Sequence, residues 1–221
     1  MKQLLKKVAS RLPHRAQQEL KRRYFARQIK YGNFRTAEPE YDMLSSLVGK
    51  GDWVIDIGAN IGHYALRLSE LVATDGRVIA FEPVPETFEL LAANASLSMF
   101  SNLTLINAAV SNAVRMSGMM IPKFRDTGLG DCYEAELTSA DSALQVFCLT
   151  LDLLNLPHQI RLVKIDVEGH ELSALQGMVE LLRRDHPLLI VEDNDPRVSA
   201  FLMDFDYRHE KVAGSSNLVF R

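Results

Sequence analysis

The sequence predicts an α/β fold in which a mostly parallel sheet carries helices on both faces. Short, almost wholly apolar runs such as 54–57 and 162–165 are typical of buried parallel strands, and segments with helical periodicity lie between them. The chain has 221 residues, of which 47% are hydrophobic and 24% charged, as expected of one soluble domain of ordinary size. This composition excludes a disordered chain, a collagen-like fibre and a coiled coil.

The first 35 residues form a basic segment. They carry eleven Lys and Arg residues and one acid, a balance of +10, whereas residues 36–221 have a balance of −13. Apolar residues at helical spacing on both sides of Pro13 predict two short amphipathic helices, the second ending near Gly32. We therefore expect a helical arm at 1–35 followed by one domain at 36–221. The arm would suit an anionic membrane surface or nucleic acid, or it would pack on its own acidic domain.

The domain is expected to begin with a helix capped by Thr36 and to continue as alternating strands and helices. The tail predicts a closing antiparallel hairpin formed by 207–213 and 218–221. Between these ends the pattern predicts strands at 54–57, 77–81, 103–106, 162–165 and 188–191, and helices at 63–72, 85–95 and 172–182.

Residues 112–150 interrupt this alternation. Strands are expected at 116–122 and 145–149, with a polar segment between them. An insertion of this length at the ligand-facing edge of an α/β sheet is commonly a functional segment. We expect it to contact the substrate.

Cell location is inferred from what the sequence lacks. No apolar run reaches the roughly 18 residues that a membrane-spanning helix needs. Lys and Arg interrupt the apolar residues of the N-terminus, unlike those of a secretory signal peptide. Cys132 and Cys148 are too few for a disulfide framework. We expect a cytoplasmic protein with reduced thiols. If the arm binds a membrane, the protein lies at the periphery of that membrane.

The turn after the first strand carries the clearest sign of a ligand. It has the sequence DIGANIG at 56–62, and glycines there permit positive φ and a close approach of backbone to ligand. Glu82 ends the second strand, 24 positions after Gly58. An acid at that place can accept both hydroxyls of a ribose. The two features together predict a nucleoside-containing ligand.

The same turn separates two kinds of nucleoside ligand. A dinucleotide-binding turn needs the pattern G-x-G-x-x-G, but Asn60 stands at the second glycine. Asp56 would also face the phosphates of a dinucleotide unfavourably. An acid suits the cationic end of S-adenosylmethionine (SAM), so the sequence favours SAM over a nicotinamide cofactor.

Several motifs within residues 38–221 resemble those of the FkbM family of SAM-dependent methyltransferases. They are VIDIGANIGHYAL (54–66), VIAFEPVPETFELLAAN (78–94), NAAVSN (107–112), LTLDLL (149–154) and LVKIDVEGHELSALQG (162–177). The resemblance implies a Rossmann-like class I methyltransferase fold with a seven-stranded sheet. It also implies methyl transfer to a hydroxyl, largely on sugars of glycans, glycolipids or natural products. The arm lies outside the resemblance.

The resemblance also implies a set of cofactor-binding residues. The turn residues would shape the methionine and ribose pocket, Glu82 would hold the ribose hydroxyls, and the segment after the third strand would contact the adenine. Carried over position by position, the set is Asp56, Gly58, Asn60, Gly62, Glu82, Asn107, Ala109 and Val110.

A sugar hydroxyl is a poor nucleophile at neutral pH and benefits from a general base. The candidates after strand 162–165 are Asp166, Glu168 and His170, with Asp166 preferred because it ends the strand and should face the methyl group. His63 is a further candidate across the crevice, and Lys164 is expected to pair with an acid.

A magnesium site is a weaker alternative for the same end of the crevice. Asp166, Asp193 and Asn194 follow neighbouring strands and could ligate Mg²⁺, which would lower the pKa of the acceptor hydroxyl. The sequence around 192–196 is equally typical of a turn and a helix cap, so the metal is not favoured.

These observations predict a SAM-dependent O-methyltransferase that acts on a carbohydrate hydroxyl. A nucleic-acid methyltransferase that uses the basic arm ranks lower, because the strand at 162–165 ends in IDVEG and not in a D/N-P-P-aromatic motif. A module that binds SAM without turnover is disfavoured by the intact motifs. A nicotinamide dehydrogenase is disfavoured by Asn60.

Overall fold

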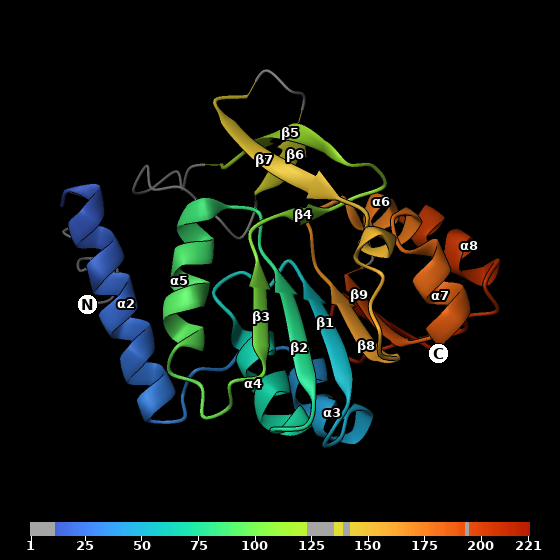
Figure 1. Cartoon of the computed structure of the whole chain (residues 1–221), viewed down its shortest axis with the longest axis horizontal. Helices are drawn as coiled ribbons and strands as arrows, with labels where there is room; N and C mark the ends of the chain where they lie inside the picture. The colour runs from blue at the N-terminus through green and yellow to red at the C-terminus, as the bar shows by residue number, and fades with distance from the viewer. Residues whose placement is uncertain (1–11, 123–134, 139–141, 193–194) are drawn as a thin grey trace.

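A seven-stranded sheet forms the centre of the molecule, with the strand order β10-β11-β9-β8-β1-β2-β3 (Figure 1). The computed structural model describes residues 12–122, 135–138, 142–192 and 195–221. Five strands are parallel, and the C-terminal hairpin is antiparallel, as predicted. The strands are β1 (Trp53–Ile57), β2 (Arg77–Phe81), β3 (Leu103–Ile106), β8 (Ile160–Ile165), β9 (Leu188–Glu192), β10 (His209–Lys211) and β11 (Asn217–Phe220).

Helices bury both faces of this sheet. Alternate residues of β1 belong to different cores: Val54 packs in the core beneath the helices α3 and α4, whereas Ile55 packs in the core beneath α6 to α8. Burial on both faces explains the nearly unbroken apolar runs of these strands. The helices are α3 (Pro39–Leu47), α4 (His63–Val72), α5 (Pro85–Ala95), α6 (Glu171–Gln176), α7 (Val179–Asp185) and α8 (Pro196–Met203), with a 3₁₀ turn η2 (Leu151–Leu154).

The described part of the basic arm is packed on the domain. Its helix α2 (His14–Lys30) lies beside α5, and Phe25 and Ile29 pack against a small core that includes Phe34 and Leu90 (Figure 1). This is the second of the two predicted helices. The first falls within residues 1–11, outside the described residues.

The insertion, together with residues 109 and 110 just before it, forms a second sheet over the carboxyl ends of the central strands (Figure 1). Its order is β4-β7-β5-β6, and the two strands predicted within it are confirmed as β5 and β7. The bounds are β4 (Ala109–Val110), β5 (Arg115–Met120), β6 (Glu136–Thr138) and β7 (Leu144–Leu149). The insertion therefore lies on the side where ligands bind in an open α/β sheet.

The single helix predicted over 172–182 is wrong, because α6 and α7 are separate. Gly177 lies between them, so close to the backbone of Ser111 that a Cβ atom would overlap the Ser111 carbonyl oxygen. Asp152, which is distant in the sequence, caps the start of α7. Its carboxylate accepts hydrogen bonds from the backbone amides of Glu180 and Leu181 at 2.9 and 3.0 Å. A partner 28 residues away leaves no local signal.

The predicted helix cap at Thr36 is also wrong. Helix α3 begins at Pro39, whose fixed φ suits the first helical position, and Glu38 precedes it as the capping residue. The Thr36 hydroxyl instead accepts a hydrogen bond from the Glu38 amide at 3.3 Å.

Among the residues that the structure describes, no helix is both long and apolar enough to cross a bilayer.

Candidate active site

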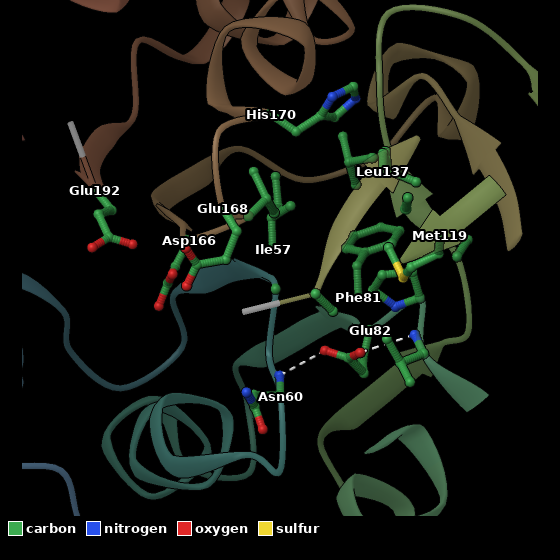
Figure 2. Close-up of a pocket in the computed structure, with 18 of the residues that line it drawn as sticks. Ile57, Asn60, Phe81, Glu82, Met119, Leu137, Asp166, Glu168, His170 and Glu192 are labelled. Atoms are coloured by element: carbon green, nitrogen blue, oxygen red, sulfur yellow. Dashed lines mark hydrogen bonds between the residues drawn. The ribbon is translucent and has the colours of Figure 1, made fainter. Parts of the chain in front are cut away.

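A pocket opens where the central strands end, beneath the small sheet (Figure 2). The chain passes from β1 to β2 and β3 on one side and later returns to β8 and β9 on the other. Such a change of direction is where open α/β sheets bind ligands. The residues that line the pocket include Glu38, Gly58, Asn60, Glu82, Ala108, Ala109, Val110, Met119, Leu137, Asp166, Glu168, His170 and Glu192.

The turn after β1 depends on left-handed backbone. Gly58, Asn60 and Gly62 have φ values of +80°, +50° and +98°. Asparagine tolerates this region better than most residues, so Asn60 takes the conformation that a glycine would have. A Cβ atom on Gly58 would overlap the carbonyl oxygen of Asp166. Glycine at 58 thus lets the ends of β1 and β8 meet at the pocket.

Glu82 is held in place by this turn. Its carboxylate accepts hydrogen bonds from the backbone amides of Asn60 and Val84, both at 2.9 Å (Figure 2). Burial raises the pKa of Glu82 to about 7. The side chain is fixed in the pocket wall, and each oxygen keeps capacity to accept a further hydrogen bond. The geometry fits the predicted contact with ribose hydroxyls.

Two more features of the wall fit a nucleoside. The side-chain oxygen of Asn60 is buried and has no hydrogen-bond partner among the described residues, which leaves an unsatisfied acceptor in the turn that borders the pocket. Beyond Glu82 the wall is apolar: Ala109 packs in one cluster with Met119 and Leu137, and Val110 also lines the pocket. A flat purine ring suits such a wall.

Three of the expected cofactor residues do not line the pocket. Asp56 is fully buried under α4, in register with Lys164, and burial raises its pKa to about 6. Gly62 begins α4 and packs against Leu91. The Asn107 amide donates to the backbone oxygens of Glu82 and Pro83, at 2.7 and 3.1 Å, so it supports the end of β2.

Lys164 and Asp166 form an ion pair at the end of β8. The Lys164 ammonium lies 2.8 Å from Oδ2 of Asp166, and the lysine side chain is 3% exposed. The expectation that Lys164 pairs with an acid is thus confirmed. Burial acts to raise the pKa of Asp166, but the ion pair and its hydrogen bond hold that pKa below its ordinary value. Asp166 is therefore ionised at neutral pH.

A second carboxyl group, Glu192 at the end of β9, meets Asp166 in the same corner. One oxygen each of Asp166, Glu168 and Glu192 lies within 4.8 Å of the others (Figure 2). Burial, then the charge of Asp166, raises the pKa of Glu192 to about 7, and a protonated Glu192 donates a hydrogen bond to Asp166. Ser216 donates to the other side of Glu192 at 3.2 Å. The corner thus joins one firmly ionised carboxylate to one that titrates near neutral pH.

Glu192 and Glu38 are the site residues that the sequence interpretation missed. Glu192 had a usable signal, since it follows a buried apolar strand as Asp166 does. Glu38 had none. It reaches the pocket from the segment before α3, and its carboxylate accepts a hydrogen bond from the Tyr64 hydroxyl at 2.6 Å.

The two histidines have different surroundings. His170 lines the pocket with its Nε2 atom 3.0 Å from the Ser111 hydroxyl, and burial lowers its pKa, with Arg115 adding to the effect. His63 stacks on Phe34 with ring centroids 4.3 Å apart, and burial lowers its pKa to about 4. His63 does not line the pocket, so the structure does not bring it to the acidic corner.

The residues of the acidic corner are oxygen donors of the kind that Mg²⁺ prefers. One oxygen of Asp166 already contacts the Lys164 ammonium, which supplies the positive charge locally. Asp193 and Asn194 of the predicted set lie outside the described residues. Asp195 caps α8 by accepting from the Arg197 amide at 2.9 Å. The magnesium site stays a prediction.

The strand order, the glycine turn and the acid that ends β2 together define a class I SAM-dependent methyltransferase fold. Residues 56–212 match the methyltransferase FkbM domain, and the chain belongs to this family.

Relatives of known identity agree with this assignment. Hexuronic acid methyltransferase AglP of Haloferax volcanii is 27% identical over 155 residues, which cover 67% of this chain and 60% of AglP. The chain thus spans less than two thirds of that relative. A crystal structure of a methyltransferase FkbM from Methylobacillus flagellatus KT matches with a TM-score of 0.54 and 16% identity, over 79% of this chain and 45% of the other.

A second solved structure supports the fold from a different protein. Aeropyrum pernix fibrillarin, solved with natively bound SAM, matches with a TM-score of 0.50 and 14% identity, over 82% of this chain and 72% of the other. At these identities the likeness shows the fold alone.

Proposed function

We propose that this chain is a SAM-dependent O-methyltransferase whose acceptor is a sugar hydroxyl. The observation that carries the proposal is the placement of acids on the two sides of β1. Glu82 ends β2 on one side, and Asp166 and Glu192 end β8 and β9 on the other, within one pocket. Membership of the FkbM family supports methyl transfer, and the likeness to a hexuronic acid methyltransferase supports a sugar acceptor.

SAM, when bound, supplies an electrophilic methyl group on a sulfonium centre. On the β2 side, Glu82 would accept hydrogen bonds from the ribose hydroxyls, and the Asn60 side-chain oxygen would accept from a donor on the same ligand. The apolar wall formed by Ala109, Val110 and Met119 packs on the adenine. These residues would hold the nucleoside part of SAM on the β2 side of the pocket.

On the β8 side, the chain must orient a hydroxyl and take up its proton. Asp166 faces the pocket as an anion held by Lys164, so it positions the hydroxyl by accepting its hydrogen bond. Its lowered pKa makes it a weaker proton acceptor than Glu192. We therefore assign proton acceptance to Glu192 and positioning to Asp166. Glu168 and His170 line the same wall and offer further hydrogen bonds to the acceptor.

The proposal is tested first by ligand binding. Calorimetry with S-adenosylhomocysteine, SAM and NAD⁺ should show binding of the two SAM-type ligands alone. A ligand at one hundred times its Kd also stabilises the fold by about 2.7 kcal/mol, which a thermal melt detects. Binding of NAD⁺ alone would overturn the cofactor assignment.

Turnover is tested with defined acceptors. S-adenosylhomocysteine release should be measured with a glycoside of a hexuronic acid, its neutral-sugar counterpart and matched deoxy analogues. We expect release with at least one sugar and none with the analogue that lacks the reacting hydroxyl. Binding of SAM with no release on any hydroxyl acceptor would favour the non-catalytic alternative.

A further inference from the structure

One side of α2 exposes apolar and aromatic side chains to solvent. The helix packs on the domain through Phe25 and Ile29, which belong to the core shared with α5. Leu20, Tyr24 and Tyr31 are 48%, 59% and 61% exposed. Their spacing of four and seven residues places them in one row along the helix and its last turn.

Three cations lie next to this row. Arg23, Arg27 and Lys30 are exposed and recur at intervals of four and three residues, so they share a side of the helix. The Arg27 guanidinium and the Lys30 ammonium lie 5.8 and 6.0 Å from the centre of the Tyr31 ring. The cationic and apolar rows are therefore adjacent, and together we call Leu20, Arg23, Tyr24, Arg27, Lys30 and Tyr31 the α2 face.

The cations of the α2 face make no ion pair with the domain among the residues that the structure describes, whereas Arg35 pairs with Asp42 at 2.6 Å. Residues 12–35 contain seven Lys and Arg residues and one acid, Glu19. Arg23 pairs with Glu19 at 2.8 Å, while Arg27 and Lys30 make no ion pair with any residue that the structure describes. Arg15 and Arg22 line a groove together with Glu86 and Glu89 of α5, whereas Arg27 and Lys30 do not.

We propose that the α2 face docks on an anionic membrane surface. Cations beside an anionic lipid surface are attracted to it, and tyrosine rings are favoured at the level of the headgroups. A helix this polar would lie at the interface and not cross it. Proteins that hold single-stranded nucleic acid combine a basic groove with stacking aromatics, whereas the α2 face is the convex side of one helix. The lipid surface is therefore the better fit.

The position of α2 relates this surface to the pocket. Near its first turn, His14 lies 3.1 Å from Glu86 of α5, four residues after Glu82 of the pocket wall. The start of α2 is thus at the same edge of the sheet as the active site (Figure 1). This geometry favours acceptors that are sugars carried by a membrane lipid, an inference that rests on the proposed function.

The test is co-sedimentation of the full chain with vesicles of phosphatidylcholine alone or mixed with phosphatidylglycerol, at about 0.1 M salt, where surface charges still act over roughly 10 Å. The variant Arg23→Glu, Arg27→Glu, Lys30→Glu should partition into the anionic vesicles at least about tenfold less than the parent chain. The parent should show little binding to the neutral vesicles.

A matched control distinguishes the effect of the α2 face on vesicle binding from the effect of net charge. The variant Arg183→Glu, Arg208→Glu, Lys211→Glu makes the same charge change at exposed positions on α7, directly before β10 and in β10. It should bind anionic vesicles several-fold better than the α2 variant. Equal binding of these two variants, or no binding of the parent to anionic vesicles, would overturn the proposal.

The apolar row has its own variant. Leu20→Ser, Tyr24→Ser, Tyr31→Ser keeps every charge and should still weaken vesicle binding, because it removes the groups that enter the headgroup layer. Unchanged partitioning of this variant would contradict docking through this face. A single-stranded RNA probe is run beside the vesicles, and RNA binding that depends on the α2 cations in the absence of vesicle binding would overturn the lipid assignment.

Binding of S-adenosylhomocysteine distinguishes this proposal from the proposed function. None of the substituted residues lines the pocket, so all three variants should bind it as the parent does. Lost vesicle binding with retained nucleoside binding then concerns the α2 face alone.

Discussion

The Lys164 ammonium lies 2.8 Å from Oδ2 of Asp166, inside the end of β8, and the lysine side chain is 3% exposed. Asp56 is in register with Lys164 on the neighbouring strand and is also fully buried. One buried cation thus stands between a carboxylate of the pocket and a carboxyl group beneath α4. The ion pair lowers the pKa of Asp166 and keeps it ionised at neutral pH. We therefore assign proton acceptance to Glu192, whose pKa is about 7.

Replacing Lys164 should cost both stability and activity. Lys164→Met leaves Asp166 without its partner, and removing one member of a buried ion pair typically costs about 3–5 kcal/mol. Urea unfolding measures the loss. The double variant Lys164→Met, Asp166→Asn should recover much of the stability without recovering methyl transfer. Equal stability of the single and double variants would show that the pair does not carry this energy.

Glu192→Gln should reduce kcat by about 10²–10⁴-fold, the usual effect of losing a general base. The parent should show kcat rising with pH through about 7, because the ionised form of Glu192 accepts the proton and its pKa is about 7. The variant should lose this rise. Ser216→Ala is the control, since it removes only the 3.2 Å hydrogen bond to Glu192 and should move the profile without abolishing turnover. A pH profile that survives in Glu192→Gln would return the role to another group.

The contribution of Glu82 and Glu192 to stability should fall as the pH rises from about 4.5 to about 7. Burial raises the pKa of Glu82 and of Glu192 to about 7 in the folded chain, from an ordinary value of 4.5. Between these values the unfolded chain releases protons that the folded chain keeps, so the stabilisation present at low pH is lost through this window. Urea unfolding of the parent and of Glu192→Gln at several pH values measures it. The free energy of unfolding should fall less with rising pH in the variant than in the parent. An equal dependence on pH in both proteins would contradict the raised pKa of Glu192.

Glu82→Ala should weaken binding of S-adenosylhomocysteine about ten- to a hundredfold, because a hydrogen bond to a charged group contributes about 1.5–3 kcal/mol. Glu89→Ala, an exposed acid on α5, is the matched control and should leave the affinity unchanged. Calorimetry gives both values. Unaltered affinity of Glu82→Ala in a folded protein would remove the ribose assignment.

Gly58→Ala and Gly169→Ala form a second matched pair. Both glycines have positive φ, +80° and +82°, so alanine carries a similar backbone cost of about 1–2 kcal/mol at each. Only at Gly58 would the added Cβ overlap the backbone of Asp166; at Gly169 it meets open space. Thermal unfolding should therefore show a much larger loss for Gly58→Ala, together with lost nucleoside binding. Similar losses for both variants would argue against a close approach of β1 and β8.

Chelation tests the metal question. We expect turnover to be insensitive to EDTA, because the Lys164 ammonium already supplies the positive charge beside Asp166. Activity that EDTA abolishes and Mg²⁺ restores would contradict this. It would place a cation among the carboxylates of the acidic corner.

Much of the fold follows from local pattern. Helix α4 and strand β2 have the bounds that the sequence predicts, because apolar periodicity and the residues that begin and end an element act over a few positions. The glycine turn and Glu82 were predictable for the same reason, since each follows directly from the strand before it. Asp166 and its pairing with Lys164 also belong to this class.

The faces of the strands were decided only by the tertiary structure. In a sheet buried on both sides, every position of β1 is apolar or enclosed, so the sequence carries no alternation to show that Asp56 turns under α4 while Ile57 lines the pocket. Contacts between distant segments were likewise invisible. Glu38 lines the pocket with its carboxylate hydrogen-bonded to the Tyr64 hydroxyl, and the break between α6 and α7 depends on Asp152. The sequence alone determined most of the elements, the family and the end of the sheet where ligands bind, because those depend on neighbours along the chain. Which carboxyl groups share a proton or a cation depends on neighbours in space, and only the packed structure brings those together.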